Sequence, residues 1–243
     1  MPTELLLAGL IVFLATFVRG FTGFGGALIM VPLLALVWDI RAVIVIVGLL
    51  QTATGAQLVR TSRKLVDRAR LKRLLAGSLV GLAIGTLLLA VLPVNWIARI
   101  LGVFTILVGG RIVIQLRGEP PAAVEPHPAT TAGVSLLAGT LHGLIGTSGP
   151  VIVPYLHRIM PSPGALRATL LAYFFALDVL RLVGYAPLGL ITSEIVWRGA
   201  LLLPIGVLGS LLGSRLHLRV RPQLFQVAVG TLLCVTGALL ILR

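Results

Sequence analysis

Long apolar runs separated by short polar stretches dominate the pattern of this chain of 243 residues. A helix needs about 20 mainly apolar residues to cross the hydrocarbon core of a bilayer. Six runs reach this length and predict membrane-spanning helices over about 41–60, 74–92, 96–116, 165–186, 195–214 and 222–242. The pattern therefore predicts an all-α integral membrane protein.

Two further apolar segments are interrupted by glycine-rich stretches. Residues 4–38 are broken at 19–26, and residues 129–160 are broken at 142–150. Each segment is too long for one helix and short for two full spans. We therefore predict that each consists of two short helices joined by a break. The choice between a re-entrant hairpin and a full double span stays open.

The two halves of the chain repeat one another. A shift of 123 residues places Arg19, Gly20, Gly23 and Gly26 on His142, Gly143, Gly146 and Gly149. A shift of 128 residues places Gly81, Gly85, Gly102 and Gly109 on Gly209, Gly213, Gly230 and Gly237. Agreement in one order along both halves indicates an internal repeat. We divide the chain into a first membrane repeat at 1–117, a proline-rich linker at 118–128 and a second membrane repeat at 129–243.

The basic residues indicate how the two repeats are oriented. Seven Lys and Arg residues lie between Arg60 and Arg73, whereas the corresponding loop at 187–197 has none. One loop later the order is reversed, because 93–98 has none and 215–221 holds three arginines. Cytoplasmic loops are enriched in Lys and Arg. The two halves are therefore predicted to form an inverted repeat, an architecture of secondary transporters with the site near the midplane.

Composition supports a membrane protein and excludes several other classes. Apolar residues make up 58% of the chain, charged residues 11%, and the net charge is +13. Such sparse charge argues against a soluble enzyme, a disordered chain and a nucleic-acid-binding protein, since soluble domains carry about 25% charged residues. The single cysteine, Cys234, cannot form an internal disulfide. We expect a multi-pass membrane protein in contact with membrane lipids.

The two glycine breaks resemble those of a known family. The first contains Gly20-Phe21-Thr22-Gly23-Phe24-Gly25-Gly26 followed by Val31-Pro32-Leu33-Leu34, and the second contains Gly143-Leu144-Ile145-Gly146-Thr147-Ser148-Gly149 followed by Val153-Pro154. These motifs resemble the TauE/SafE family of sulfite-exporter-like membrane proteins. The resemblance implies transport of small organic or sulfur-containing anions, such as sulfite, organosulfonates and related carboxylates, across the bacterial cytoplasmic membrane.

The breaks are also the best candidates for a binding site on physical grounds. Non-helical backbone inside a membrane is tolerated only within protein or along a water-filled cavity. A helix that starts at such a break presents free N–H groups to an anion. We predict that the substrate-binding residues are Arg19, Gly20, Thr22, Gly23, Gly25, Gly26, His142, Gly146, Thr147, Ser148 and Gly149. Close helix packing is the alternative explanation for the glycines.

Each polar candidate also has a structural explanation. Arg19 either grips the anion or extends to the membrane interface. His142 either donates to the substrate and carries a proton, or caps a backbone carbonyl. Thr22, Thr147 and Ser148 offer hydroxyl groups, which also bond readily to nearby backbone carbonyls.

A second polar level is predicted on the later helices. Asp178 and Arg181 are three residues apart and share a helix face. They form either an internal salt bridge, or a proton-coupling carboxylate with a second substrate contact. The repeat places Thr52, next to Gln51, opposite Asp178, which suggests a lined pathway.

The leading hypothesis is a secondary transporter that exports a small anion by alternating access. No Gly-x-x-x-x-Gly-Lys-Ser/Thr motif is present, so the chain has no P-loop for ATP. We expect no enzyme activity, cofactor or metal, and either membrane potential or proton coupling as driving force. An anion channel, an intramembrane enzyme using Ser148 and His142, and an assembly partner are the alternatives. A homodimer and a monomer both stay open.

Overall fold

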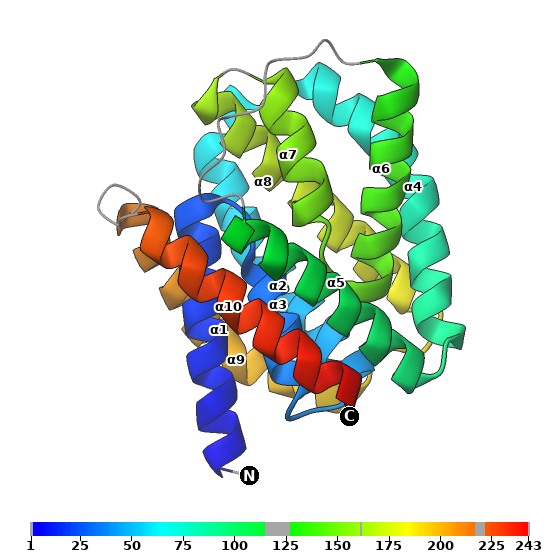
Figure 1. Cartoon of the computed structure of the whole chain (residues 1–243), viewed down its shortest axis with the longest axis vertical. Helices are drawn as coiled ribbons and strands as arrows, with labels where there is room; N and C mark the ends of the chain where they lie inside the picture. Colours follow the sequence, from blue (N-terminus) through cyan, green and yellow to red (C-terminus); the bar gives the residue numbers. More distant parts are fainter. Residues whose placement is uncertain (1, 115–126, 161, 217–221, 243) are drawn as a thin grey trace.

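A computed structural model of the protein describes residues 2–114, 127–160, 162–216 and 222–242, which contain helices and no strand (Figure 1). The first half contains α1 (Pro2–Thr22), α2 (Gly26–Ala35), α3 (Ile40–Ser62), the short 3₁₀ helix η1 (Arg63–Leu65), α4 (Arg68–Val91) and α5 (Val94–Ile114). The second half contains α6 (Pro128–Ile145), α7 (Gly149–Ile159), α8 (Pro163–Tyr185), α9 (Ser193–Leu216) and α10 (Pro222–Leu242). Most of the predicted linker, and residues 217–221 of the second basic loop, lie outside the described residues.

The predicted all-α membrane protein is confirmed. The six runs expected to span the membrane all form helices of 21–24 residues, which are α3, α4, α5, α8, α9 and α10. Four of them, α3, α4, α5 and α9, are candidate spans by the length and apolar character of their described residues, and α1 is a fifth. Among the described residues, five helices are long and apolar enough to cross a membrane, at Thr3–Thr22, Ile40–Leu65, Arg68–Val91, Val94–Ile114 and Ser193–Arg215. Many of their large apolar side chains face outward, including Leu107 at 67% exposure. Such an apolar surface suits contact with lipid.

The broken segments differ from the prediction in their lengths. The first helix of each segment is long, 21 residues in α1 and 18 in α6, whereas α2 and α7 have 10 and 11 residues. The expectation of two short helices is therefore wrong for α1 and α6. The breaks themselves span only residues 23–25 and 146–148, so Arg19 and His142 lie in the last helical turns before them.

Glycine permits both breaks because the backbone there enters the left-handed region. The φ angles are 88° at Gly23, 87° at Gly25 and 75° at Gly146. Side chains with a Cβ rarely adopt this conformation. The first two turns close in the same way, since the N–H of Gly23 donates to Arg19 O at 2.7 Å and that of Gly146 donates to His142 O at 3.1 Å.

The most extensive helix contacts join the first half of the chain to the second. Helix α4 packs along α6, α1 along α9, α5 along α10, and α3 against α8 (Figure 1). The two halves therefore interlock, and the core lies between them. Helix α2 is buried at nine of its ten positions, as expected for a helix that is apolar on every face.

The closest helix contacts occur at glycines and repeat between the halves. A Cβ on Gly85 of α4 would lie 2.1 Å from Thr140 O of α6, and a Cβ on Gly213 of α9 would lie 2.0 Å from Phe17 O of α1. Adding 128 to 85 gives 213, and adding 123 to 17 gives 140, so the two contacts are related by the shifts found in the sequence. This agreement supports the internal repeat. The inversion of the halves across the membrane, and the exact repeat boundaries, stay predictions.

Candidate functional site

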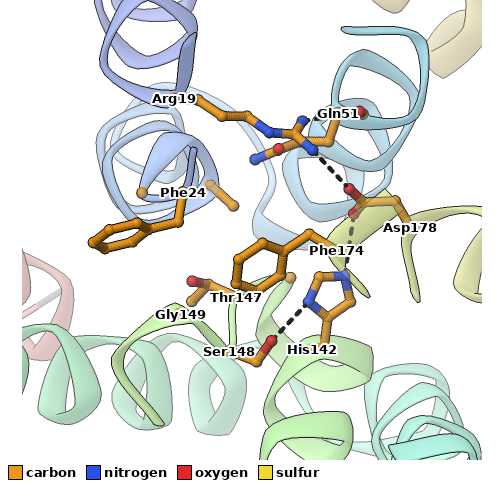
Figure 2. Close-up of a pocket in the computed structure, with 12 residues that line it drawn as sticks. Arg19, Phe24, Gln51, His142, Thr147, Ser148, Gly149, Phe174 and Asp178 are labelled. Atoms are coloured by element: carbon orange, nitrogen blue, oxygen red, sulfur yellow. Dashed lines mark hydrogen bonds and ion pairs between the residues drawn. The ribbon is translucent and has the colours of Figure 1, made fainter. Parts of the chain in front are cut away.

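The two glycine breaks border one pocket in the interior (Figure 2). It holds about 290 Å³ of empty space, part of which is open to the outside. The cavity proper is small, about 20 Å³, which is little more than the ~10–15 Å³ that one water molecule needs, so a bound solute would have to widen it. The pocket is lined by Arg19, Phe24, Gly25, Ala27, Gln51, His142, Gly146, Thr147, Ser148, Gly149, Phe174 and Asp178.

Asp178 of α8 is the centre of a buried charged cluster. Its carboxylate lies 3.5 Å from Arg19 Nη2, 3.1 Å from His142 Nε2 and 3.1 Å from Arg181 Nη2. Exposure of these four residues is between 0% and 3%. The cluster joins α1, α6 and α8, which come from both halves of the chain.

Arg19 is held in place by α3 as well as by Asp178. Its Nη1 donates to Gln51 O at 2.8 Å and to Thr54 Oγ1 at 3.2 Å. A Cβ at Gly55 would lie only 3.1 Å from Arg19 Nη2, so this glycine makes room for the guanidinium. With 1% exposure, Arg19 does not extend to a membrane interface, and that alternative is excluded.

His142 connects Asp178 to the second break (Figure 2). Its Nε2 lies 3.1 Å from Asp178 Oδ1, and its Nδ1 lies 3.2 Å from Ser148 Oγ. Phe174 stacks on the imidazole ring with 6.3 Å between the centroids. Both ring nitrogens are therefore engaged, and the ring orientation is fixed.

The cluster contains more positive than negative charge. Two guanidinium groups, Arg19 and Arg181, face the single carboxylate of Asp178. Arg181 Nη1 donates to His142 O at 3.4 Å. Its Nη2 is ion-paired with Asp178 at 3.1 Å, but neither Nη2 nor Nε has a partner in hydrogen-bond geometry among the described residues. An unbalanced buried charge costs several kcal/mol unless it is compensated. The pocket beside the cluster is therefore suited to an anion.

Comparisons with known proteins identify the family of the chain. Residues 8–240 match the model of the family described as "Sulfite exporter TauE/SafE". The chain belongs to the TauE/SafE family. A relative from Comamonas testosteroni, named "Probable inner membrane transporter protein TsaS", is 29% identical over 165 residues, which is 68% of this chain and 68% of the relative. No solved structure matches the chain. The resemblance seen at the glycine breaks is thus confirmed, and this TauE/SafE protein is a multi-pass membrane transport protein of the cytoplasmic membrane.

Two candidates from the first break lie outside the pocket of this TauE/SafE protein. A Cβ on Gly20 would lie 2.3 Å from Ser210 O, so Gly20 serves the close packing of α1 on α9. The hydroxyl of Thr22 lies 2.9 Å from Val18 O and 2.6 Å from Phe24 O. Gly20 therefore serves close helix packing, and the Thr22 hydroxyl bonds to nearby backbone carbonyls.

Arg181, Gly23 and Gly26 were also predicted as site residues, but they do not line the pocket. Arg181 lies next to Asp178 but does not line the cavity. Gly23 makes room for Arg167, whose Cγ would be 3.1 Å from an added Cβ. Gly26 starts α2 beside the stem of Arg19, which an added Cβ would approach to 3.1 Å.

Thr52 and its neighbour Gln51 have different environments. Gln51 lines the pocket, and its carbonyl oxygen anchors Arg19. Thr52 does not line the pocket, and its buried hydroxyl has no hydrogen-bond partner among the described residues. Within those residues, no three His, Cys, Asp or Glu side chains are grouped as metal ligands would be.

Several pocket residues were not predicted from the sequence. Phe24 lies within the first glycine motif, and Phe174 lies four residues before Asp178 on the same face of α8. This spacing was available in the sequence, but an aromatic residue in an apolar run gave no signal of its own. Arg167 was also missed, and its Nη2 donates to Gly20 O at 2.8 Å at the end of α1.

Proposed function

We propose that this TauE/SafE protein is a secondary transporter that exports a small anion such as sulfite, an organosulfonate or a related carboxylate. The observation that carries the proposal is the pocket between the two breaks, which lies beside a buried cluster of two arginines and one carboxylate and is lined by Arg19 and Asp178 of that cluster. Arg19, Thr147 and Ser148 line the pocket and carry the donors that a small anion with acceptors on several sides would use. The family description, a sulfite exporter, supports a sulfur-containing substrate, and the name of the Comamonas relative supports transport across the inner membrane.

The position of the pocket between the two halves supports alternating access. It is lined by Ala27 in the first turn of α2 and by Gly149 at the start of α7, and the N-termini of both helices carry partial positive charge. Discontinuous helices that meet at an anion are characteristic of inverted-repeat transporters. Export follows from energetics, since moving one negative charge out of a negative interior yields about 2.3 kcal/mol per 100 mV.

The experiment that tests this proposal is counterflow of labelled sulfite into proteoliposomes. We expect accumulation that saturates and that is stimulated by sulfite or a small sulfonate on the opposite side. An anion channel would instead give flux that is not stimulated from the opposite side.

Matched arginine substitutions locate the transport site. Arg19→Gln should abolish counterflow, because it removes the guanidinium that faces the pocket. Arg99→Gln is the control, since Arg99 lies exposed on α5 over the ring of Trp96, with 5.6 Å between Cζ and the ring centroid. Equal transport by both variants would contradict the proposed site.

The hydrogen-bonded series Ser148–His142–Asp178 favours hydrolysis as a second candidate function. A serine, a histidine and a carboxylate also form the triad of many hydrolases, in which Nε2 faces the serine and Nδ1 the carboxylate; here Nδ1 faces Ser148 and Nε2 faces Asp178. A fluorophosphonate probe labels an activated serine covalently, and Ser148→Ala is the control. Transport predicts no labelling above that of the control, whereas labelling lost in Ser148→Ala would establish the hydrolytic alternative.

A further inference from the structure

We propose that the pocket selects its substrate by charge, binding a monoanion directly and a dianion only together with a proton on His142. This inference rests on the proposed function of the pocket as an anion site, and it defines the substrate class of that site. The three observations behind it are the charge of the cluster, the hydrogen bonds of His142 and the position of Ser148.

The first step is the charge count inside the protein. Arg19 and Arg181 contribute two positive charges and Asp178 one negative charge, all with exposure of 1% or less. The N-termini of α2 and α7 add partial positive charge, but the C-termini of α1 and α6 end at the same breaks with partial negative charge. The side chains therefore decide the balance, which is one positive charge. A monoanion neutralises it, whereas a dianion leaves one negative charge in excess.

The second step is that His142 can supply the missing positive charge. Histidine is the side chain that gains or loses a proton near neutral pH. The charged groups that act on it are Asp178 and Arg181 from α8 and Arg19 from α1. Without an anion, two nearby cations oppose a further positive charge. With a dianion in the pocket, the opposite balance favours the protonated ring.

The third step concerns the direction of the hydrogen bond to Ser148. A carboxylate only accepts, so in the neutral ring Nε2–H donates to Asp178 and Nδ1 accepts from the Ser148 hydroxyl. When Nδ1 takes up a proton from water, it donates to Ser148 Oγ instead. The Ser148 hydroxyl then no longer donates to His142, so it can donate a hydrogen bond to the substrate instead. Protonation of His142 thus adds one positive charge and one hydrogen-bond donor to the pocket.

Other ionisable side chains near this site do not replace His142 in the role. Tyr173 pairs with Ser78 at 2.7 Å and lies beside Ser148, and the hydroxyl of Tyr185 donates to Gly143 O at 2.8 Å. Both hydroxyls are engaged with partners on neighbouring helices. The lining residues from α2, α3 and α7 that face the pocket carry no ionisable side chain.

The proposal makes a specific statement about charge transport. A sulfonate or hydrogen sulfite crosses alone, whereas sulfite or sulfate crosses with one proton. The protein then moves one net negative charge per cycle with either class of substrate. The proton is returned to water when the dianion leaves, and His142 again accepts from Ser148.

The test compares a fixed monoanion with a fixed dianion on the purified full-length protein. Calorimetric titrations with methanesulfonate and with sulfate, each in two buffers of different ionisation enthalpy, report the protons taken up on binding. At pH values above neutral, we expect the protein to take up about one proton for each sulfate bound and none for each methanesulfonate bound. Sulfate affinity should then fall about tenfold per unit rise in pH, as one linked proton requires, while methanesulfonate affinity stays level.

Two histidine substitutions test whether His142 is the group that takes up the proton when sulfate binds. His142→Gln retains hydrogen-bonding groups but cannot be protonated, so it should abolish proton uptake and weaken sulfate at least tenfold more than methanesulfonate. His157→Gln on the exposed side of α7 is the control and should behave as the unmodified protein. If His142→Gln does not fold, the proton count of the unmodified protein still decides the proposal.

The outcomes separate this inference from the proposed function. Equal proton uptake for both anions, or sulfate binding without a proton, would overturn charge selection and leave the anion site in place. Failure of both anions to bind would contradict the proposed function itself.

Discussion

Because the buried cluster holds more positive than negative charge, removing its carboxylate should destabilise the protein far more than removing one of its arginines. Asp178→Asn removes the only carboxylate and leaves Arg19 and Arg181 facing each other without compensation. Arg19→Met removes one guanidinium, preserves most of the side-chain volume and leaves Arg181 paired with Asp178. We expect the first variant to be strongly destabilised and the second to be about as stable as the unmodified protein in the absence of an anion.

The magnitude follows from the two distances to Asp178. At 3.5 Å and 3.1 Å, with an effective dielectric constant of about 20, each attraction is worth about 5 kcal/mol. Asp178→Asn forfeits both, and breaking one buried pair costs about 3–5 kcal/mol in measured cases. Arg19→Met forfeits one attraction but also removes the desolvation cost of a guanidinium, which is several kcal/mol. The two variants should therefore differ by at least about 3 kcal/mol.

Thermal unfolding of the detergent-purified variants measures this difference. For a protein of this size, about 3 kcal/mol corresponds to a difference of about 6–12 °C between the unfolding midpoints. A sulfonate at 100 times its dissociation constant should stabilise the unmodified protein by about 2.7 kcal/mol and should leave Arg19→Met unchanged. Equal destabilisation by both substitutions, or an Asp178→Asn variant as stable as the unmodified protein, would refute the charge count.

Three further predictions concern glycines and a helix cap. Gly85→Ala should lower the temperature of the unfolding midpoint, because the new Cβ would lie 2.1 Å from a carbonyl oxygen of α6. The control is Gly133→Ala, which should raise the midpoint slightly, since no atom lies within 4 Å of the new Cβ and Ala favours a helix over Gly. A higher midpoint in both variants would contradict the close packing of α4 on α6. Gly146→Ala should cost about 1–3 kcal/mol of stability and weaken anion binding, since φ is 75° and the Cβ would lie 2.7 Å from Arg181 Nη1. The N–H groups of the first turn of α4 hold the pKa of Asp67 below its ordinary value of 3.8, so its cap stabilises the fold above about pH 4 and is lost as the pH falls through the lowered pKa. Asp67→Ala should therefore cost about 1 kcal/mol at neutral pH and progressively less below about pH 4 in acid unfolding experiments; a constant difference would count against this.

Local patterns in the sequence predicted the helices and the chemistry near each break. Apolar length located the spans, and the three-residue spacing of Asp178 and Arg181 indicated the ion pair that the structure contains at 3.1 Å. Glycine spacing located the breaks, where Gly23, Gly25 and Gly146 adopt positive φ. These features depend on residues close together in the chain, so the sequence alone was sufficient.

Features that depend on which helices meet were not predictable in this way. Arg19 reaches Asp178 across 159 positions of sequence, and no local pattern indicates that α1 and α8 meet at that height. The pattern of residue types also could not separate Gly20, which packs on α9, from Gly25, which lines the pocket. Thr22 was ambiguous for a similar reason, because its hydroxyl is equally suited to a ligand and to the nearby carbonyls it contacts.

The most direct test of the account is to locate a bound anion. Selenite has the shape and charge of sulfite and carries an atom with a strong anomalous signal. A crystal structure of the protein with selenite should therefore contain an anomalous peak between the two breaks, within hydrogen-bond distance of Arg19 and Ser148. A peak confined to the basic loop at 60–73, or a pocket without selenite at saturating concentration, would contradict the account.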